Sequence, residues 1–202
     1  MENLDYILLN VPEDKSRNVT ISTYEKWRDS QKVDEISEFV YERLYRRYVK
    51  IFEYDEREFK ANYKNGFSMM ANSCLLIETI ESFYRGWDKS QSELAFLKFF
   101  TRDRNFIQFS TSDILTKFYK HIRCGILHQG ETTGGWKITR NTTSPLLDTT
   151  KLEINANKFL EQIRKSLEDY KQELKTSDWQ STVWANCKKK MSSIVNNCKK
   201  YS

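Results

Sequence analysis

An arginine and a histidine stand five positions apart in the stretch Arg-Cys-Gly-Ile-Leu-His, residues 123–128. Histidine titrates near neutral pH, so His128 could act as a general acid or a general base. Arginine stays charged and can hold two phosphate oxygens at once, so Arg123 could stabilise the transition state of phosphate chemistry. One such pair supplies a single proton-transfer group and a single phosphate-binding group, and a two-fold dimer would bring a second pair.

The spacing of this pair raises a geometric question. Five residues apart on a regular α-helix, two side chains point about 140° away from each other. Either the helix loosens at Gly125, because glycine tolerates unusual backbone angles, or the pair converges across a dimer interface, and we favour a combination of the two. The alternative interpretation is that Arg123 forms a surface salt bridge and that His128 only ends a helix.

Other familiar arrangements for catalysis or metal binding are absent from the sequence. Gly134 and Gly135 precede a strand-like pattern, not the helix that follows a phosphate-binding loop. His121 and His128 share a helix face but lie about 10 Å apart, which is too far for one metal ion. No nucleophile elbow supports a serine triad, and the cysteines form no Cys-x-x-Cys pair. We therefore expect no metal and no cofactor, and reduced thiols at Cys74, Cys124, Cys187 and Cys198.

Further side chains could support the Arg–His pair. Glu78 lies on an apolar helix and could hydrogen-bond either member of the pair and orient it. Glu81 and Arg85, on the same helix, are most simply an i,i+4 surface pair. His121 could bind substrate, or it could be a half-buried structural histidine. We include Cys124, which follows the arginine directly, among the supporting residues.

Three residues near the pair are candidates for RNA binding. Lys120 and Gln129 flank the pair in the sequence, and Trp136 follows shortly after. Trp136 could stack on a base, although packing within a hairpin is the alternative. The lysines at 188–190 and 199–200 could follow phosphate groups, or they could form the polar face of the last helix.

Helices must position these residues, because apolar side chains recur every three or four positions along most of the chain. We expect a helix over residues 33–52 that could continue to residue 64. A very apolar helix over 67–86 would be the central one, and a shorter helix covers 93–100. The polar cluster at 110–113 supplies capping groups for the helix that carries the Arg–His pair.

The remaining pattern completes a bundle. Apolar and polar residues alternate at 136–139 and 152–154, a pattern that predicts a small β-hairpin. Asn155 can cap the next helix, and Ser177 with Gln180 resembles a capping box that opens the last one. The expected fold class is all-α, a bundle of about five or six helices with a small hairpin after the motif helix. We expect an irregular N-terminal arm over 1–31, the bundle over 32–176 and a C-terminal helix over 177–202.

Composition and charge favour a globular protein. The 202 residues include only 6 Gly and 2 Pro, which argues against disordered Pro/Gly-rich and all-β classes. Lys and Arg number 33 against 28 Asp and Glu, and the net charge of +5 permits a polyanionic partner such as RNA without demanding one. No basic leader precedes an apolar run, and no run approaches the roughly 20 residues of a membrane span. We therefore expect a soluble, cytoplasmic protein.

The segment FYKHIRCGILHQGETTGGWKI, residues 118–138, resembles the signature of the HEPN superfamily (higher eukaryotes and prokaryotes nucleotide-binding). The mark of this superfamily is an arginine and a histidine separated by four to six residues near the end of a bundle helix. The segment is most similar to a bacterial branch with an RCGLLHQ-like stretch and a following Trp-x-Ile strand. Together with ANSCLLIETIESFYRGW, the similarity extends loosely over residues 67–174.

This resemblance implies an α-helical bundle, frequent homodimers across the motif face and metal-independent RNA cleavage, often in toxin or phage-defence systems. It implies Arg123 and His128 as the catalytic residues. Many members carry a polar residue directly after the arginine, whereas this chain carries Cys124. Two functions follow as expectations: a dimeric endoribonuclease, or a non-catalytic binding or scaffold subunit in a defence or toxin–antitoxin complex. The expected partners are RNA, a second copy of the chain and an antitoxin or defence-system protein.

Overall fold

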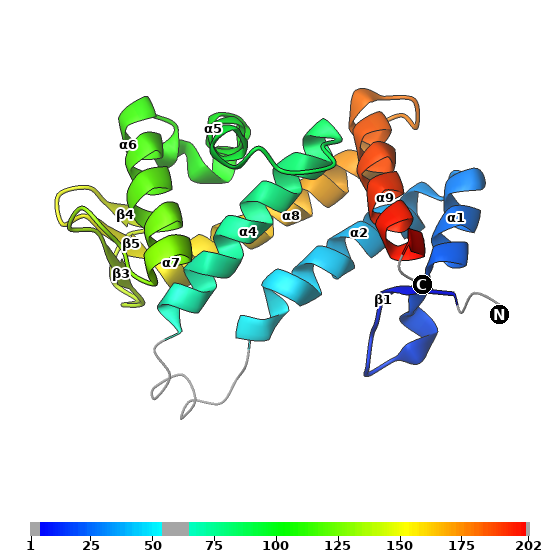
Figure 1. The fold of residues 1–202 in the computed structure, drawn as a ribbon, viewed down its shortest axis with the longest axis horizontal. Coiled ribbons are helices and arrows are strands. Elements are labelled where there is room, and N and C mark those ends of the chain that lie inside the picture. The colour runs from blue at the N-terminus through cyan, green and yellow to red at the C-terminus, as the bar shows by residue number, and fades with distance from the viewer. Residues whose placement is uncertain (1–4, 54–64, 201–202) are drawn as a thin grey trace. The chain divides into compact units, whose positions relative to one another are not determined.

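The computed structural model of this chain describes residues 5–53 and 65–200. The described chain is mostly helical, with small sheets (Figure 1). It divides into two compact units. The Arg–His pair and the residues expected to support it all belong to unit 2. Unit 1 comprises Met1–Arg46, Ser82–Lys89 and Leu167–Ser202, and unit 2 comprises Arg47–Glu81 and Ser90–Ser166.

Unit 2 holds the expected central helix and the helix that carries the motif. α4 (Gly66–Arg85) and α5 (Ser92–Arg102) confirm two of the expected helices, and α4 continues into unit 1. In Figure 1 the motif lies on one continuous helical segment, which we call the motif column. The column begins at the expected polar cluster, although Thr111 makes no side-chain capping hydrogen bond. Its parts are α6 (Ser112–Lys117), a π-helical segment (Phe118–Arg123) and α7 (Cys124–Gln129).

A cluster of phenylalanines forms the core of unit 2 and holds the motif column in place. Phe118, on the column, stacks on Phe159 with ring centroids 5.4 Å apart and meets Phe100 edge-on at 5.1 Å. Phe159 belongs to α8 (Ala156–Thr176), so the cluster fixes the column against α5 and α8. Pairs of this kind add about 0.5–1.5 kcal/mol each beyond the burial of their area.

Replacing Phe118 by alanine should lower the free energy of unfolding by about 3–5 kcal/mol, because a fully buried ring would leave a cavity. Chemical denaturation followed by circular dichroism measures this change. Ile107→Ala is the control, since Ile107 is 70% exposed and its loss should change the free energy by less than about 0.5 kcal/mol. Equal effects of the two substitutions would show that the cluster does not anchor the column.

The expected β-hairpin is wrong. β3 (Lys137–Thr139) pairs with β5 (Glu153–Asn155) in parallel, and β4 (Leu147–Asp148) pairs with β5 antiparallel, which gives the strand order β3-β5-β4. A hairpin needs a short turn, whereas residues 140–152 are long enough to cross over and add an edge strand. The expected cap of the next helix is confirmed, because Asn155 Oδ1 accepts a hydrogen bond from the backbone N–H of Lys158.

Unit 1 contains more regular structure near the N-terminus than the sequence predicts. β1 (Ile7–Leu9) and β2 (Val19–Thr20) pair antiparallel, and α1 (Ile21–Asp29) follows directly. Thr20 caps α1 by accepting a hydrogen bond from Thr23 N–H. Strands of two or three residues are too short to show a periodic pattern, so the segment reads as irregular in the sequence. Its apolar residues are nevertheless buried: Leu8, Leu9, Val11, Val19, Ile21 and Tyr24.

Unit 1 also contains most of α2 (Val33–Tyr48), the C-terminal part of α8 and the whole of the last helix. α2 confirms the expected first helix, and a 3₁₀ turn (Lys50–Phe52), which belongs to unit 2, follows it. The possible continuation to residue 64 lies outside the described residues. α9 (Thr182–Lys200) begins later than the capping-box pattern predicts, because Asp178 instead accepts a hydrogen bond from Gln180 N–H in a turn before the helix. None of the described helices is long and apolar enough to cross a lipid bilayer.

Candidate active site

A change of helix type, from π-helix to α-helix, comes directly after Arg123. The backbone N–H of Cys124 donates to the carbonyl oxygen of Tyr119, five residues back, which is the bond of a π-helix. The expected loosening at Gly125 is wrong, because Gly125 lies within α-helical α7. Its small size serves another purpose: a Cβ there would lie 2.5 Å from the carbonyl oxygen of Glu131, where the chain folds back over the helix.

Arg123 and His128 meet within one chain. Nη1 of Arg123 lies 3.3 Å from Nε2 of His128. Because a guanidinium can only donate, Nε2 is the acceptor of this hydrogen bond. His128 is exposed, whereas the Arg123 side chain is only 12% exposed. The long side chain of arginine bridges the angle between the two positions, so the pair needs no second subunit to form.

Glu78 holds the opposite side of the guanidinium. Nε and Nη2 of Arg123 both donate to Oε1 of Glu78, at 3.1 and 2.8 Å. The expected contact between Glu78 and the Arg–His pair is therefore present, and it goes to the arginine. Both side chains are nearly buried, with exposed fractions of 12% and 13%. The interpretation of Arg123 as one half of a surface salt bridge does not fit this geometry.

Ser92 completes the network, and the sequence analysis did not identify it. Its hydroxyl accepts a hydrogen bond from Nη2 of Arg123 at 3.1 Å and donates to Oε2 of Glu78 at 3.3 Å. Ser92 is the first residue of α5, far from the motif in the sequence. Serine is common at helix starts, so only the packing of α5 beside α4 and the motif column distinguishes it.

Tyr119 is a second neighbour that the sequence analysis did not identify. The guanidinium carbon of Arg123 lies 5.6 Å from the centre of the Tyr119 ring, within the range of a cation–π contact. Burial raises the pKa of the Tyr119 phenol, and the nearby Cys124 adds to the rise. Burial alone would lower the pKa of Arg123, but the hydrogen bonds and the charge of Glu78 outweigh burial and raise it. Arg123 therefore remains a cation.

His121 holds the glycine-rich turn that follows the motif. Its Nδ1 lies 2.8 Å from the hydroxyl of Thr133, whose backbone N–H donates to the carbonyl oxygen of His121. At Gly134, where φ is +61°, a Cβ would lie 2.6 Å from the imidazole. Only glycine tolerates both this backbone angle and this approach. These contacts favour the structural interpretation of His121 over substrate binding.

Among the candidates for RNA contact, Lys120 and Gln129 are exposed and Trp136 is not. The expectation that Trp136 offers a stacking surface is wrong, because its side chain is only 4% exposed and a base could not reach the ring. The expected surface location of Glu81 is also wrong. Glu81 is fully buried and forms an ion pair with Arg102 at 2.9 Å.

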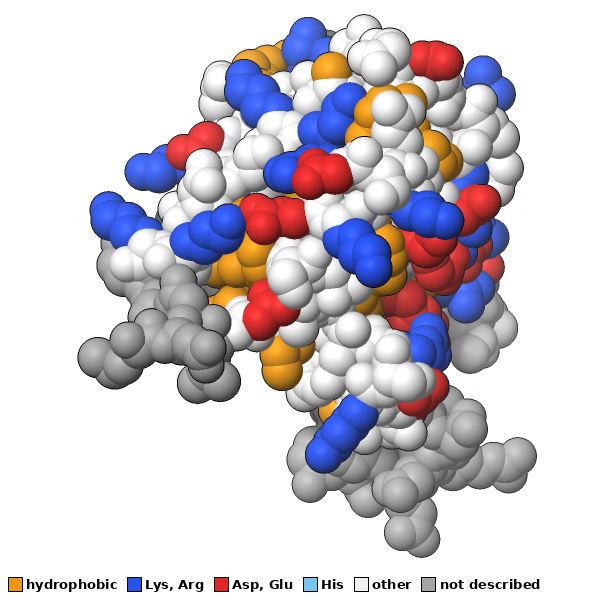
Figure 2. Space-filling view, turned by 90° about the vertical axis from the view of Figure 1, so that its right-hand side faces the viewer, with side chains coloured by type: hydrophobic (Ala, Val, Ile, Leu, Met, Phe, Trp, Pro, Cys, Tyr) orange, Lys and Arg blue, Asp and Glu red, His pale blue; other side chains and the backbone are white. Residues whose placement is uncertain are grey.

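The lysines of α9 are engaged within unit 1. Lys188 lies 4.3 Å from the centre of the Trp179 ring, Lys190 donates to the carbonyl oxygen of Asp88, and Lys199 pairs with Glu25. Figure 2 shows a face on which basic and acidic side chains are interspersed. Both observations favour the polar-face interpretation of these lysines over a phosphate-binding surface.

Two of the four cysteines should resist thiol reagents in the folded protein. Burial raises the pKa of the Cys187 thiol to about 12, and it also raises the pKa of Cys74, so both are protonated at pH 8. Cys124 and Cys198 are half-buried and should react first. A time course with a disulfide reagent, before and after denaturation, measures the fast and slow thiols. A Cys124→Ser variant should lose one fast thiol, and four equally fast thiols would contradict the burial.

Among residues 5–53 and 65–200, no group of three or more His, Cys, Asp or Glu side chains is arranged to hold a metal ion. Comparison with protein-family models, with curated proteins and with solved structures finds no match. The geometry of the Arg123–His128–Glu78–Ser92 network is therefore the basis on which a function can be argued.

Proposed function

We propose that the chain is a metal-independent endoribonuclease of the HEPN type. The observation that carries the proposal is the contact between Arg123 and His128, because it joins a fixed positive charge to an exposed group that can move a proton. Glu78 and Ser92 hold the guanidinium from the other side, which leaves the exposed imidazole at the surface where RNA would approach.

In the proposed reaction, the 2′-hydroxyl of RNA attacks the adjacent phosphorus while the bond to the 5′-oxygen breaks. A phosphate oxygen replaces His128 Nε2 as acceptor of the Arg123 Nη1 hydrogen, which frees the imidazole lone pair to take the 2′-hydroxyl proton. Arg123 stabilises the negative charge on the pentacoordinate phosphorus. The leaving 5′-oxygen receives its proton from an acid, for which we propose His128 of a second subunit in its protonated imidazolium form. The products are a 2′,3′-cyclic phosphate and a 5′-hydroxyl end.

We infer that the protein acts on RNA as a homodimer in the cytoplasm. Its role would be that of a toxin or a phage-defence protein, with an antitoxin or defence-system protein as a further partner.

Incubation of the pure protein with mixed RNAs in the presence of a chelator tests this function. We expect cleavage, and end analysis of the products should find 2′,3′-cyclic phosphates and 5′-hydroxyls. Intact RNA, or 3′-hydroxyl ends, would overturn the proposal.

Cys124 favours a second candidate, a non-catalytic binding or scaffold subunit of a defence or toxin–antitoxin complex. Where many HEPN members carry a polar residue, this half-buried thiol lies beside the Tyr119 phenol. In that case the wild type and a His128→Ala variant should be equally harmless when expressed. A toxic wild type rescued by the single substitution would leave this candidate without support.

A further inference from the structure

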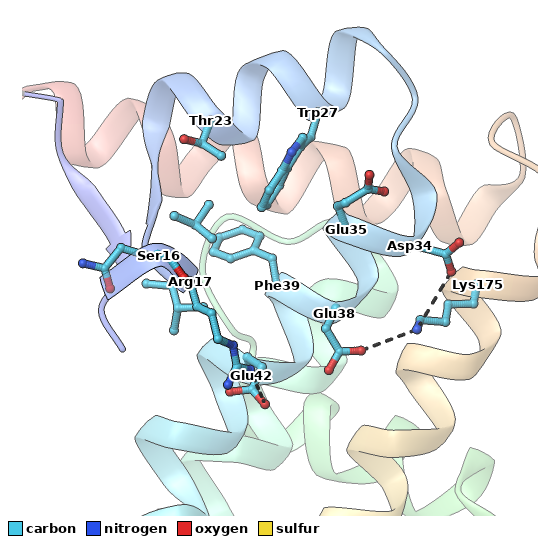
Figure 3. Close-up of a pocket in the computed structure, with 13 residues that line it drawn as sticks. Ser16, Arg17, Thr23, Trp27, Asp34, Glu35, Glu38, Phe39, Glu42 and Lys175 are labelled. Carbon is cyan, nitrogen blue, oxygen red and sulfur yellow. Dashed lines mark hydrogen bonds and ion pairs between the residues drawn. The ribbon is translucent and has the colours of Figure 1, made fainter. Parts of the chain in front are cut away.

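A pocket of about 580 Å³ opens within unit 1, between the N-terminal strands, α1 and α2 (Figure 3). This volume lies within the range of small-molecule sites, about 300–1,000 Å³. The described residues that line it all belong to unit 1, so the pocket is independent of the Arg–His site in unit 2. Its apolar lining comes from Leu9, Val19, Trp27 and Phe39.

Two aromatic rings border the pocket at an angle to each other. The centroids of Trp27 and Phe39 are 6.5 Å apart and the ring planes are tilted by 59°. In Figure 3, Trp27 extends from α1 toward Phe39 on α2. Phe39 is only 2% exposed, whereas Trp27 is half-buried and can still accept a ligand. The face of an indole ring attracts cations more strongly than that of any other side chain.

Carboxylates from α2 give the pocket a negative mouth. Four carboxylates and two basic side chains line it, a local balance of −2 on a chain whose net charge is +5. One of the four, Glu42, is closely held by Arg46 at 2.5 Å. Glu35 and Glu38 are 42% and 44% exposed, and three lysines pair with them at 3.4–3.6 Å, longer than a charge-assisted hydrogen bond. A bound cation competes with these lysine ammonium groups for the two carboxylates.

We propose that this pocket binds a small organic cation, an ammonium or guanidinium group attached to a flat apolar body. The positive group lies between the Trp27 ring and the carboxylates of Glu35 and Glu38. The apolar body packs along the half-buried Trp27 side chain, where it displaces water from apolar surface. The same carboxylates repel an anionic ligand, so the site selects by charge as well as by shape.

A pair of matched probes tests the proposal on the full chain. Phenethylammonium and 2-phenylethanol share one apolar body, and only the first carries a charge. Titration followed through the indole N–H signal of Trp27 in two-dimensional NMR spectra should give about tenfold tighter binding of the ammonium. Equal affinities, the absence of binding, or shifts that exclude the Trp27 signal would each overturn the proposal.

The double variant Glu35→Gln/Glu38→Gln identifies the source of the preference. It should lose most of the tenfold preference while binding 2-phenylethanol as the wild type does, because only the charges are removed. Glu161→Gln, which removes an exposed carboxylate paired with Lys165 in unit 2, is the matched control and should keep the preference. If the double variant still binds the ammonium tenfold more tightly, Glu35 and Glu38 are not the source of the preference and the proposal is wrong. None of these outcomes depends on RNA cleavage.

Discussion

His128→Ala should reduce the rate of RNA cleavage by about 10²–10⁴-fold, because it removes the group that takes up the 2′-hydroxyl proton. The imidazole is exposed and its one described hydrogen-bond contact is with Nη1 of Arg123, so the fold should be almost unaffected. The bonds from Arg123 to Glu78 and Ser92 do not involve His128 and should persist in the variant. Initial rates on one RNA, measured in chelator, give the effect directly.

Lys117→Ala is the matched control for this prediction. Lys117 is an exposed residue on the same column, and its ion pair with Asp113 is a surface contact worth less than about 1 kcal/mol. Its removal should leave the cleavage rate within about twofold of the wild type. Equal rates for the wild type and His128→Ala would defeat the catalytic role of His128, even if cleavage itself is observed.

Arg123→Lys should reduce cleavage by about 10²–10³-fold although it keeps the positive charge. A lysine ammonium is a point charge and cannot reach Glu78, Ser92 and a phosphate at the same time, as the planar guanidinium can. Lysine is preferable to alanine here, because alanine would leave Glu78 as an unpaired, nearly buried carboxylate and could unfold unit 2.

Thermal unfolding of the same variant separates catalysis from stability. Arg104→Lys, a conservative change at an exposed arginine of unit 2, is the control and should match the wild type in both rate and melting temperature. If Arg123→Lys cleaves RNA at the wild-type rate, the guanidinium is not the group that stabilises the transition state. If it loses activity only because it no longer folds at the assay temperature, the network is structural and not catalytic.

Local pattern was sufficient to predict the long helices, although not α1. The apolar residues of α2 and α4 recur every three or four positions within one element, so they do not depend on the rest of the fold. Residue type and spacing likewise identified Arg123 and His128 as the candidate pair. Glu78 could be proposed as a partner of the pair because it lies on an apolar helix. The sequence did not show whether Glu78 would bond the arginine or the histidine.

Tertiary structure decided the rest. Ser92 reaches Arg123 only because α5 packs beside the motif column, and Trp136 is buried only because the chain folds back over that column. The parallel pairing of β3 with β5 depends on a long crossover that no local pattern encodes. The physical reason is the same in each case. Helical periodicity is a property of residues that are neighbours in the sequence. A contact between distant residues depends on how whole helices and strands pack, and this packing depends on how all the core side chains fit together.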